Sequence, residues 1–77
     1  MKVNLLFFGQ LTDITGVGST TIGGFNDTAM LPEALVKIYP ELETTKYVLA
    51  INNEQVTNNT ILTDNCTVAL LPPFSGG

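Results

Sequence analysis

The carboxylate that follows Gly76-Gly77 is the group in this 77-residue sequence best suited to do chemistry. Glycine has no Cβ and tolerates nearly any φ and ψ, so two glycines in a row can lie extended in a passage too narrow for larger side chains. A terminal carboxyl group, with a usual pKa of about 3.3 to 3.7, is ionised at neutral pH and is a poor acyl electrophile. The ending therefore predicts an acyl group that another protein's active site activates.

Two prolines just before this ending predict how it is presented. Pro72 and Pro73 fix φ near about −65° and favour extended geometry in the residue ahead of each. We therefore expect residues 72–77, here called the tail, to project from the rest of the chain. The competing interpretation is a frayed end or a cloning remnant, which the Ser75-Gly76-Gly77 ending alone would also fit.

The rest of the sequence offers no group from which to predict catalysis by the chain itself. It contains no histidine or arginine, and one cysteine, Cys66, so neither general acid-base catalysis by histidine nor a tetrahedral zinc site is expected. Cys66 has no basic neighbour in sequence to stabilise a thiolate and is interpreted as a buried structural residue. We expect a protein that is acted upon, that is not an enzyme on its own, and that binds no metal or cofactor.

Composition restricts the class of protein and its partners. Hydrophobic residues make up 44% of the chain and charged residues 13%, which predicts one compact domain over residues 1–77. A net charge of −4 argues against nucleic acid and anionic membranes as partners. No apolar stretch approaches the roughly 18 residues of a membrane span. With a single cysteine as well, the expected location is the cytoplasm.

The hydrophobic pattern predicts five strands and one main helix. The strands are expected at Lys2–Phe8, Ser19–Ile22, Tyr47–Ile51, around Val56, and at Cys66–Leu71. The helix is expected to start at a cap on Asp27 or Thr28 and to stop near Tyr39 before Pro40, with Leu31, Leu35, Ile38 and Leu42 facing inward and Met30 as a core filler. This order predicts an α+β fold of the ubiquitin-like β-grasp class, in which one helix lies across one face of a mixed sheet. Its first and last strands are parallel and adjacent.

Period-two alternation separates the two faces of the central strands. The side chains expected against the helix are Val3, Leu5, Phe7, Val68 and Leu70. Those expected on the opposite face, beside the start of the tail, are Leu6, Phe8, Ala69 and Leu71. A contiguous apolar surface of this kind predicts a docking site for another protein. The alternative is that the loop at residues 10–16 covers Leu6.

Several segments together resemble the small subunits of molybdopterin synthases, a family of sulfur carriers with the β-grasp fold. The matching segments are residues 2–10, Tyr39-Pro40-Glu41-Leu42, Ala50-Ile51-Asn52, and residues 68–77, whose Pro-Pro-Phe-Ser-Gly-Gly ending is the most diagnostic.

The resemblance implies a specific chemistry. An ATP-dependent activating enzyme would adenylate the Gly77 carboxylate, and Gly76, which has no side chain, would let this end enter the active site. The adenylated carboxylate would then become a thiocarboxylate. The tail would then enter the large subunit of the synthase and deliver sulfur to cyclic pyranopterin monophosphate. The chain would use ATP only through that enzyme and would bind no cofactor. The residues implied in partner binding are Phe8, Leu6, Ala69, Leu71, Pro72, Pro73, Phe74 and Ser75.

Three other functions remain open at this point. A sulfur carrier of the thiamine pathway shares the fold and the Gly-Gly ending but usually lacks the Pro-Pro-x-Ser stretch. A ubiquitin-like modifier would instead join Gly77 to lysines of target proteins. A plain binding module would make no use of Gly77 at all.

Overall fold

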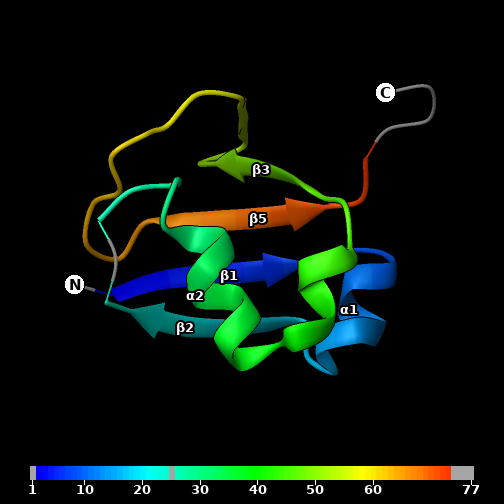
Figure 1. The fold of residues 1–77 in the computed structure, drawn as a ribbon. Coiled ribbons are helices and arrows are strands. Elements are labelled where there is room, and N and C mark those ends of the chain that lie inside the picture. Colours follow the sequence, from blue (N-terminus) through cyan, green and yellow to red (C-terminus); the bar gives the residue numbers. More distant parts are fainter. Residues whose placement is uncertain (1, 25, 74–77) are drawn as a thin grey trace.

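The computed structural model describes residues 2–24 and 26–73, which form a two-layer α+β fold. A five-stranded mixed sheet in the order β2-β1-β5-β3-β4 carries its helices on one face (Figure 1). The elements are β1 (Lys2–Phe7), α1 (Gln10–Thr15), β2 (Ser19–Gly23), α2 (Leu31–Ile38), the 3₁₀ helix η1 (Pro40–Thr44), β3 (Val48–Ile51), β4 (Glu54–Val56) and β5 (Thr67–Leu71). The predicted fold class and the order of the five strands are confirmed.

The first and last strands lie side by side in the sheet. β1 and β5 are parallel, with Leu5 opposite Val68 and Phe7 opposite Leu70. β2 pairs antiparallel with β1, and β3 pairs antiparallel with β5. The parallel pairing brings the carboxyl ends of β1 and β5 to the same edge of the sheet.

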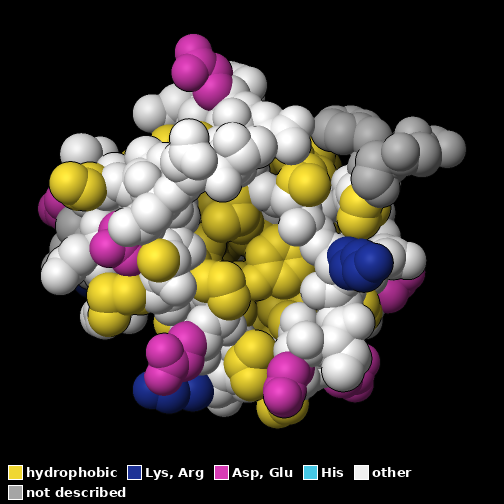
Figure 2. Space-filling view, turned by 45° about the horizontal axis from the view of Figure 1, so that its top comes forward, with side chains coloured by type: hydrophobic (Ala, Val, Ile, Leu, Met, Phe, Trp, Pro, Cys, Tyr) yellow, Lys and Arg dark blue, Asp and Glu magenta, His cyan; other side chains and the backbone are white. Residues whose placement is uncertain are grey.

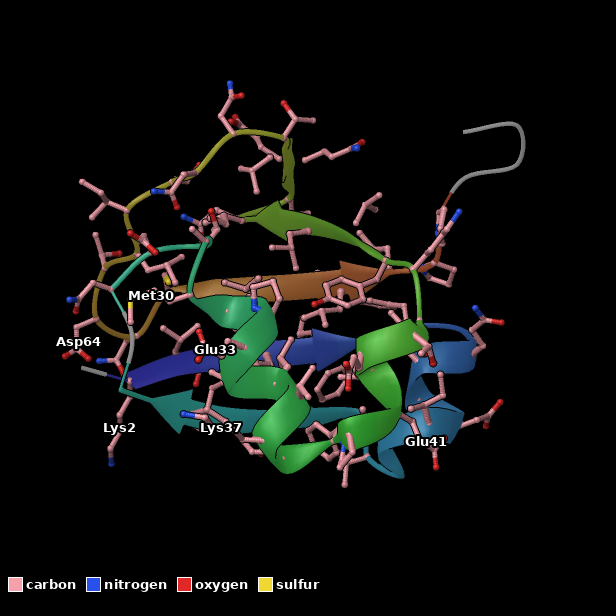
Figure 3. The ribbon with its side chains drawn as sticks, viewed as in Figure 1. Lys2, Met30, Glu33, Lys37, Glu41 and Asp64 are labelled. Carbon is pink, nitrogen blue, oxygen red and sulfur yellow. The ribbon has the colours of Figure 1, made fainter. Side chains whose placement is uncertain are left out.

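Asparagines make the two turns that fix the register of the C-terminal half. Asn52 and Asn53 have φ of 51° and 71°, the left-handed values that a two-residue type I′ hairpin needs at both central positions. Asn65, with φ of 64°, turns the chain into β5. Its N–H donates to the Lys2 carbonyl at 2.7 Å, and the Lys2 N–H donates to Asp64 Oδ1 at 2.8 Å (Figure 3). These bonds align β5 with β1.

The core lies between the sheet and the helices. Val3, Leu5, Val68 and Leu70 are fully buried and Phe7 nearly so, as the alternation predicted. They pack with Leu31 and Leu35 of α2 and Leu11 of α1. The rings of Phe7 and Tyr39 meet edge to face, with centroids 5.7 Å apart.

The first helix corrects the expectation of a loop at residues 10–16. Gln10–Thr15 forms α1, which buries Leu11 and packs Ile14 against the core. The helix has six residues, no side-chain cap at its start, and Gly16 in the left-handed conformation at its end. Its only core-facing residues are Leu11 and Ile14, and one pair of apolar residues three positions apart does not establish a helical period.

The second helix starts later than predicted and ends where it was predicted to end, next to Tyr39. Its N-cap is Met30, which is 45% exposed and therefore no core filler. Asp27 Oδ1 accepts the Met30 N–H at 3.1 Å, whereas Thr28 is buried and its Oγ1 accepts the Thr60 N–H at 2.8 Å.

At its other end, α2 stops at Ile38, and Ile38 is 50% exposed, so its inward assignment was wrong. Pro40 cannot continue an α-helix. The chain tightens into η1 instead, and this change of pitch brings Leu42 into the core.

Candidate protein-interaction site

The face of the sheet opposite the helices carries an apolar row across three strands. Leu6 of β1 lies opposite Ala69 of β5, which lies opposite Ala50 of β3. Because side chains alternate along each strand, all three lie on the face that no helix covers. Together with Phe8 and Leu71, they surround a hollow of about 520 Å³. The two alanines have the smallest side chains in the row and therefore leave room for the hollow between the larger side chains.

Four sequence-predicted residues meet at this hollow: Leu6, Phe8, Ala69 and Leu71. We call these four the open-face patch. Phe8 is 44% exposed, and its N–H donates to the Leu70 carbonyl at 3.1 Å, which holds it beside β5 just past the end of β1. The other three residues are partly buried. No residue of α1 lines the hollow, and α1 buries Leu11 in the core instead, so α1 does not cover Leu6.

The hollow is uncharged. Besides the open-face patch, its lining consists of Ala50, Asn52, Asn53 and Thr67. The side chains thus offer apolar area together with amide and hydroxyl groups. Such a surface favours contact with an apolar protein surface over binding of an ion.

The chain leaves β5 next to this patch. Pro72 follows Leu71 directly and lies against Gly9, where a Cβ would be only 2.8 Å from Pro72 Cγ. Gly9 has φ of 57° and ψ of −135°, a conformation that residues with a Cβ rarely adopt. A glycine at this position therefore allows Pro72 to seat against the end of β1, beside Phe8. Pro73 is partly buried as well.

Four of the predicted site residues, Phe74, Ser75, Gly76 and Gly77, lie outside the described residues. Of the predicted set, the structure thus brings together the open-face patch and Pro72, and it places Pro73 at the next position of the chain. Sequence reasoning missed Gly9 and Ala50. The signal for Ala50 was available, because it alternates with Leu49 and Ile51, whereas the role of Gly9 depends on a contact with a residue 63 positions away.

Residues 2–24 and 26–73 also bear on metal binding, thiol chemistry and membrane insertion. Within these ranges, no cluster of three or more His, Cys, Asp or Glu residues could hold a metal ion. Cys66 is a free and buried thiol, as predicted. No helix in the described part of the chain is long and apolar enough to cross a membrane.

A family profile, a curated relative and a solved structure are each similar to nearly the whole of this chain. The profile of the ThiS family matches residues 5–77. The molybdopterin synthase sulfur carrier subunit of Arabidopsis thaliana is 32% identical over 82 residues, which cover 100% of this chain and 84% of that protein. A structure of the complex of subunits 1 and 2 of the molybdopterin-converting factor from Helicobacter pylori contains a chain that is 31% identical, with a TM-score of 0.72 and full coverage of both chains.

Two more distant structures share the fold. A putative molybdopterin converting factor subunit 1 from Pyrococcus furiosus is 22% identical, with a TM-score of 0.84 over 96% of this chain and 99% of its own. The SAMP1 protein of Haloferax volcanii is 21% identical, with a TM-score of 0.82 over the whole of both chains. At these identities the likeness establishes the β-grasp fold alone.

Proposed function

Because this chain belongs to the ThiS family, we propose that it carries sulfur on Gly77 for a molybdopterin synthase. The family predicted from the sequence is confirmed, and the chain is of the sulfur carrier subunit type. The observation that carries the proposal is the position of the tail: Pro72, which begins it, lies against Gly9, directly beside the open-face patch. A partner that binds the patch would therefore have the following residues within reach.

The proposed chemistry activates Gly77 in two steps. Its carboxylate attacks the α-phosphorus of ATP in an activating enzyme, which releases pyrophosphate and leaves an acyl adenylate. A hydrosulfide equivalent then displaces AMP and leaves a thiocarboxylate. The sulfur of this group is a softer and stronger nucleophile than the oxygen it replaces.

Delivery takes place in the large subunit of the synthase. Sulfur passes to cyclic pyranopterin monophosphate, and water restores the Gly77 carboxylate. Two deliveries supply the two sulfur atoms of the dithiolene. This chain supplies the sulfur, and the large subunit supplies the catalytic groups. Gly76 and Gly77 suit both active sites, because an ending without side chains fits two differently shaped passages.

We propose that the open-face patch docks both partners. Leu6, Phe8 and Leu71 lie next to one another on an uncharged surface, and covering this surface removes apolar area from water. The relative from Helicobacter pylori was solved as a complex of subunits 1 and 2, which supports a large subunit as one occupant. Phe74 and Ser75 are expected to follow the prolines into the same partner.

Reconstitution tests this function. The chain, the large subunit, the activating enzyme, ATP, a sulfur donor and the pterin precursor are combined, and dithiolene product is measured. Product is expected with the intact chain and is expected to vanish when Gly77 is deleted. Cys66→Ala is the control, since Cys66 is buried away from the tail and no step uses its thiol. Product formed without Gly77 would contradict the proposal.

A ubiquitin-like modifier is the second candidate, and the fold shared with SAMP1 makes it structurally feasible. A modifier would form isopeptide bonds between Gly77 and lysines of other proteins, and immunoblots of cell extracts would show conjugates of higher mass. A sulfur carrier of the thiamine pathway would load sulfur in the same way, but it would support thiazole synthesis and give no dithiolene in the reconstitution.

A further inference from the structure

The hydrogen-bonded ladder between β1 and β5 cannot continue past Phe8. The Phe8 N–H donates to the Leu70 carbonyl at 3.1 Å. In a parallel pair, the carbonyl of such a residue accepts in return from the residue two positions further along the neighbouring strand, which here is Pro72. Proline has no N–H to donate. The ladder with β1 therefore does not hold the chain where the tail begins.

The chain also changes direction at this point, and Figure 1 shows it bending away from the line of β5. Leu71 lines the hollow on the open face, whereas Pro73 lines a groove of about 1150 Å³ on the helix side, between α2, η1 and the β3–β4 hairpin. Figure 2 shows this groove as an apolar hollow. On a continuing strand, residues two positions apart would point to the same face. The chain therefore turns at Pro72, where the ring lies against Gly9.

The first turn of α1 replaces the bond that the ladder lacks. The Leu11 N–H donates to the Phe8 carbonyl at 3.1 Å, which is the carbonyl that Pro72 leaves without a ladder donor. Leu11 itself is fully buried in the core. Figure 1 shows α1 at the edge of the sheet where β1 and β5 end. The helix thus connects the residue before Gly9 to the core.

Thr12 holds the segment around Gly9 with two further hydrogen bonds. Its N–H donates to the Gly9 carbonyl at 3.1 Å, and its Oγ1 donates to the Phe7 carbonyl at 3.0 Å in a partly buried position. Core packing does not require this hydroxyl, because Leu11 and Ile14 are the residues through which α1 packs into the core. The hydroxyl instead fixes the end of β1 against which the tail begins.

We propose that Thr12 is a positioning residue for the tail. Its hydroxyl keeps Gly9 in the place where Pro72 can seat, and it thereby sets the direction in which the chain leaves the sheet. Thr12 is not part of the lining of the open-face hollow, so its effect is separate from docking. A defined exit reduces the conformations from which the Gly77 carboxylate must find an active site, and this raises the rate within the complex. The effect on rate rests on the proposed function, whereas the seating of Pro72 does not.

The seat is tested in the free chain by nuclear Overhauser effects between the Gly9 Hα protons and the Pro72 ring protons. A Cβ on Gly9 would lie 2.8 Å from Pro72 Cγ, so the Hα in that place is close enough to give a strong effect. Thr12→Val keeps the shape of the side chain and removes the hydroxyl. It should lower the ratio of seated to unseated chain about two- to tenfold, the range for one hydrogen bond, and weaken the effect accordingly. Thr12→Ser restores a hydroxyl and should restore the effect.

Thr15→Val is the matched control on the same helix. The Thr15 Oγ1 donates to the Val17 carbonyl at 2.9 Å, so the same chemical change is made at the far end of α1, away from Gly9. The amide signal of Val68 monitors the core in all variants. An Overhauser effect that keeps its full strength in Thr12→Val, or that Thr15→Val weakens equally, would overturn the proposal.

Sulfur loading tests the consequence for the reaction. The activating enzyme, ATP and a sulfur donor are mixed with each variant, and thiocarboxylate on Gly77 is measured against chain concentration. Thr12→Val should lower kcat by no more than about tenfold and leave KM unchanged, because the open-face patch is intact, and Thr12→Ser should restore kcat. A raised KM with an unchanged kcat, or an unchanged kcat despite a weakened Overhauser effect, would overturn the role in the reaction. If even the intact chain takes up no sulfur, the proposed function fails, and the Overhauser effects alone decide whether Thr12 positions the tail.

Discussion

At the scale of single residues, Gly9 does two things that a larger residue cannot do. Its φ of 57° lies in the left-handed region, and the place of its missing Cβ is 2.8 Å from Pro72 Cγ. Any side chain here must strain the backbone and displace Pro72. Because Pro72 begins the tail, Gly9 sets where the tail leaves the sheet.

Gly9→Ala is therefore expected to lower the free energy of unfolding by about 1 to 3 kcal/mol, from backbone strain and the clash with Pro72. Gly18→Ala is the matched control, because a Cβ at Gly18 meets nothing within 4 Å. Its effect is expected to stay within about 0.5 kcal/mol. Urea unfolding of both variants measures the difference, and equal stabilities would refute the role assigned to Gly9.

Tyr47 gives a prediction for pH. Burial raises its pKa above 10.0 in the folded protein, so between the unfolded and folded pKa values the folded state holds a proton that the unfolded state has lost. The stability linked to this group is complete below pH 10 and decreases as pH rises through the folded pKa. Tyr47→Phe should lose less stability than the intact chain between neutral pH and pH 11, as measured by urea unfolding at both pH values. An equal loss in both would contradict the assignment.

At the scale of elements, the carboxyl ends of β1 and β5 explain why the open-face patch lies next to the start of the tail. Parallel pairing brings Phe8, which follows β1, next to Leu70 and Leu71 of β5. The tail begins one residue later. The strand pair thus places the proposed docking surface and the start of the tail together, and neither strand alone would do so.

Phe8→Ser should weaken binding of the large subunit about three- to ninefold, because full burial of a phenylalanine side chain is worth about 1.5 to 3 kcal/mol and a partner can cover only the 44% of Phe8 that is exposed. Calorimetric titration with the large subunit measures this change. Ile61→Ser is the control: Ile61 is 80% exposed, and it lies outside the open-face patch, where it bridges to Asp27. Equal affinities of the two variants would show that the patch is not the interface.

Some elements could be predicted from the sequence and others could not, for physical reasons. The faces of β1 and β5 were predictable, because successive side chains along a strand point to opposite faces of the sheet. Leu5 and Leu6 must therefore lie on opposite faces. α1 was not, because six residues carry too few apolar positions to define a period. Ile38 was assigned inward on a helical spacing that Pro40 interrupts, and Leu42 reached the core through a 3₁₀ turn that this spacing does not describe.

At the scale of the whole molecule, two apolar surfaces flank the start of the tail. The open-face patch includes Leu71, and the groove on the helix side, between α2, η1 and the β3–β4 hairpin, includes Pro73. The patch could be predicted from alternation. The groove could not, because it arises from how little of a five-stranded sheet one eight-residue helix covers.

The mass of the intact chain tests the central claim most directly. The chain is coexpressed with its activating enzyme and a sulfur source, purified without reducing agents that exchange sulfur, and measured by mass spectrometry beside a variant that lacks Gly77. We predict a population in which one oxygen atom is replaced by sulfur, located by fragmentation at Gly77 and missing from the variant. A chain that keeps its unmodified mass in the presence of a competent activating enzyme, or a variant that gains sulfur equally, would contradict the account.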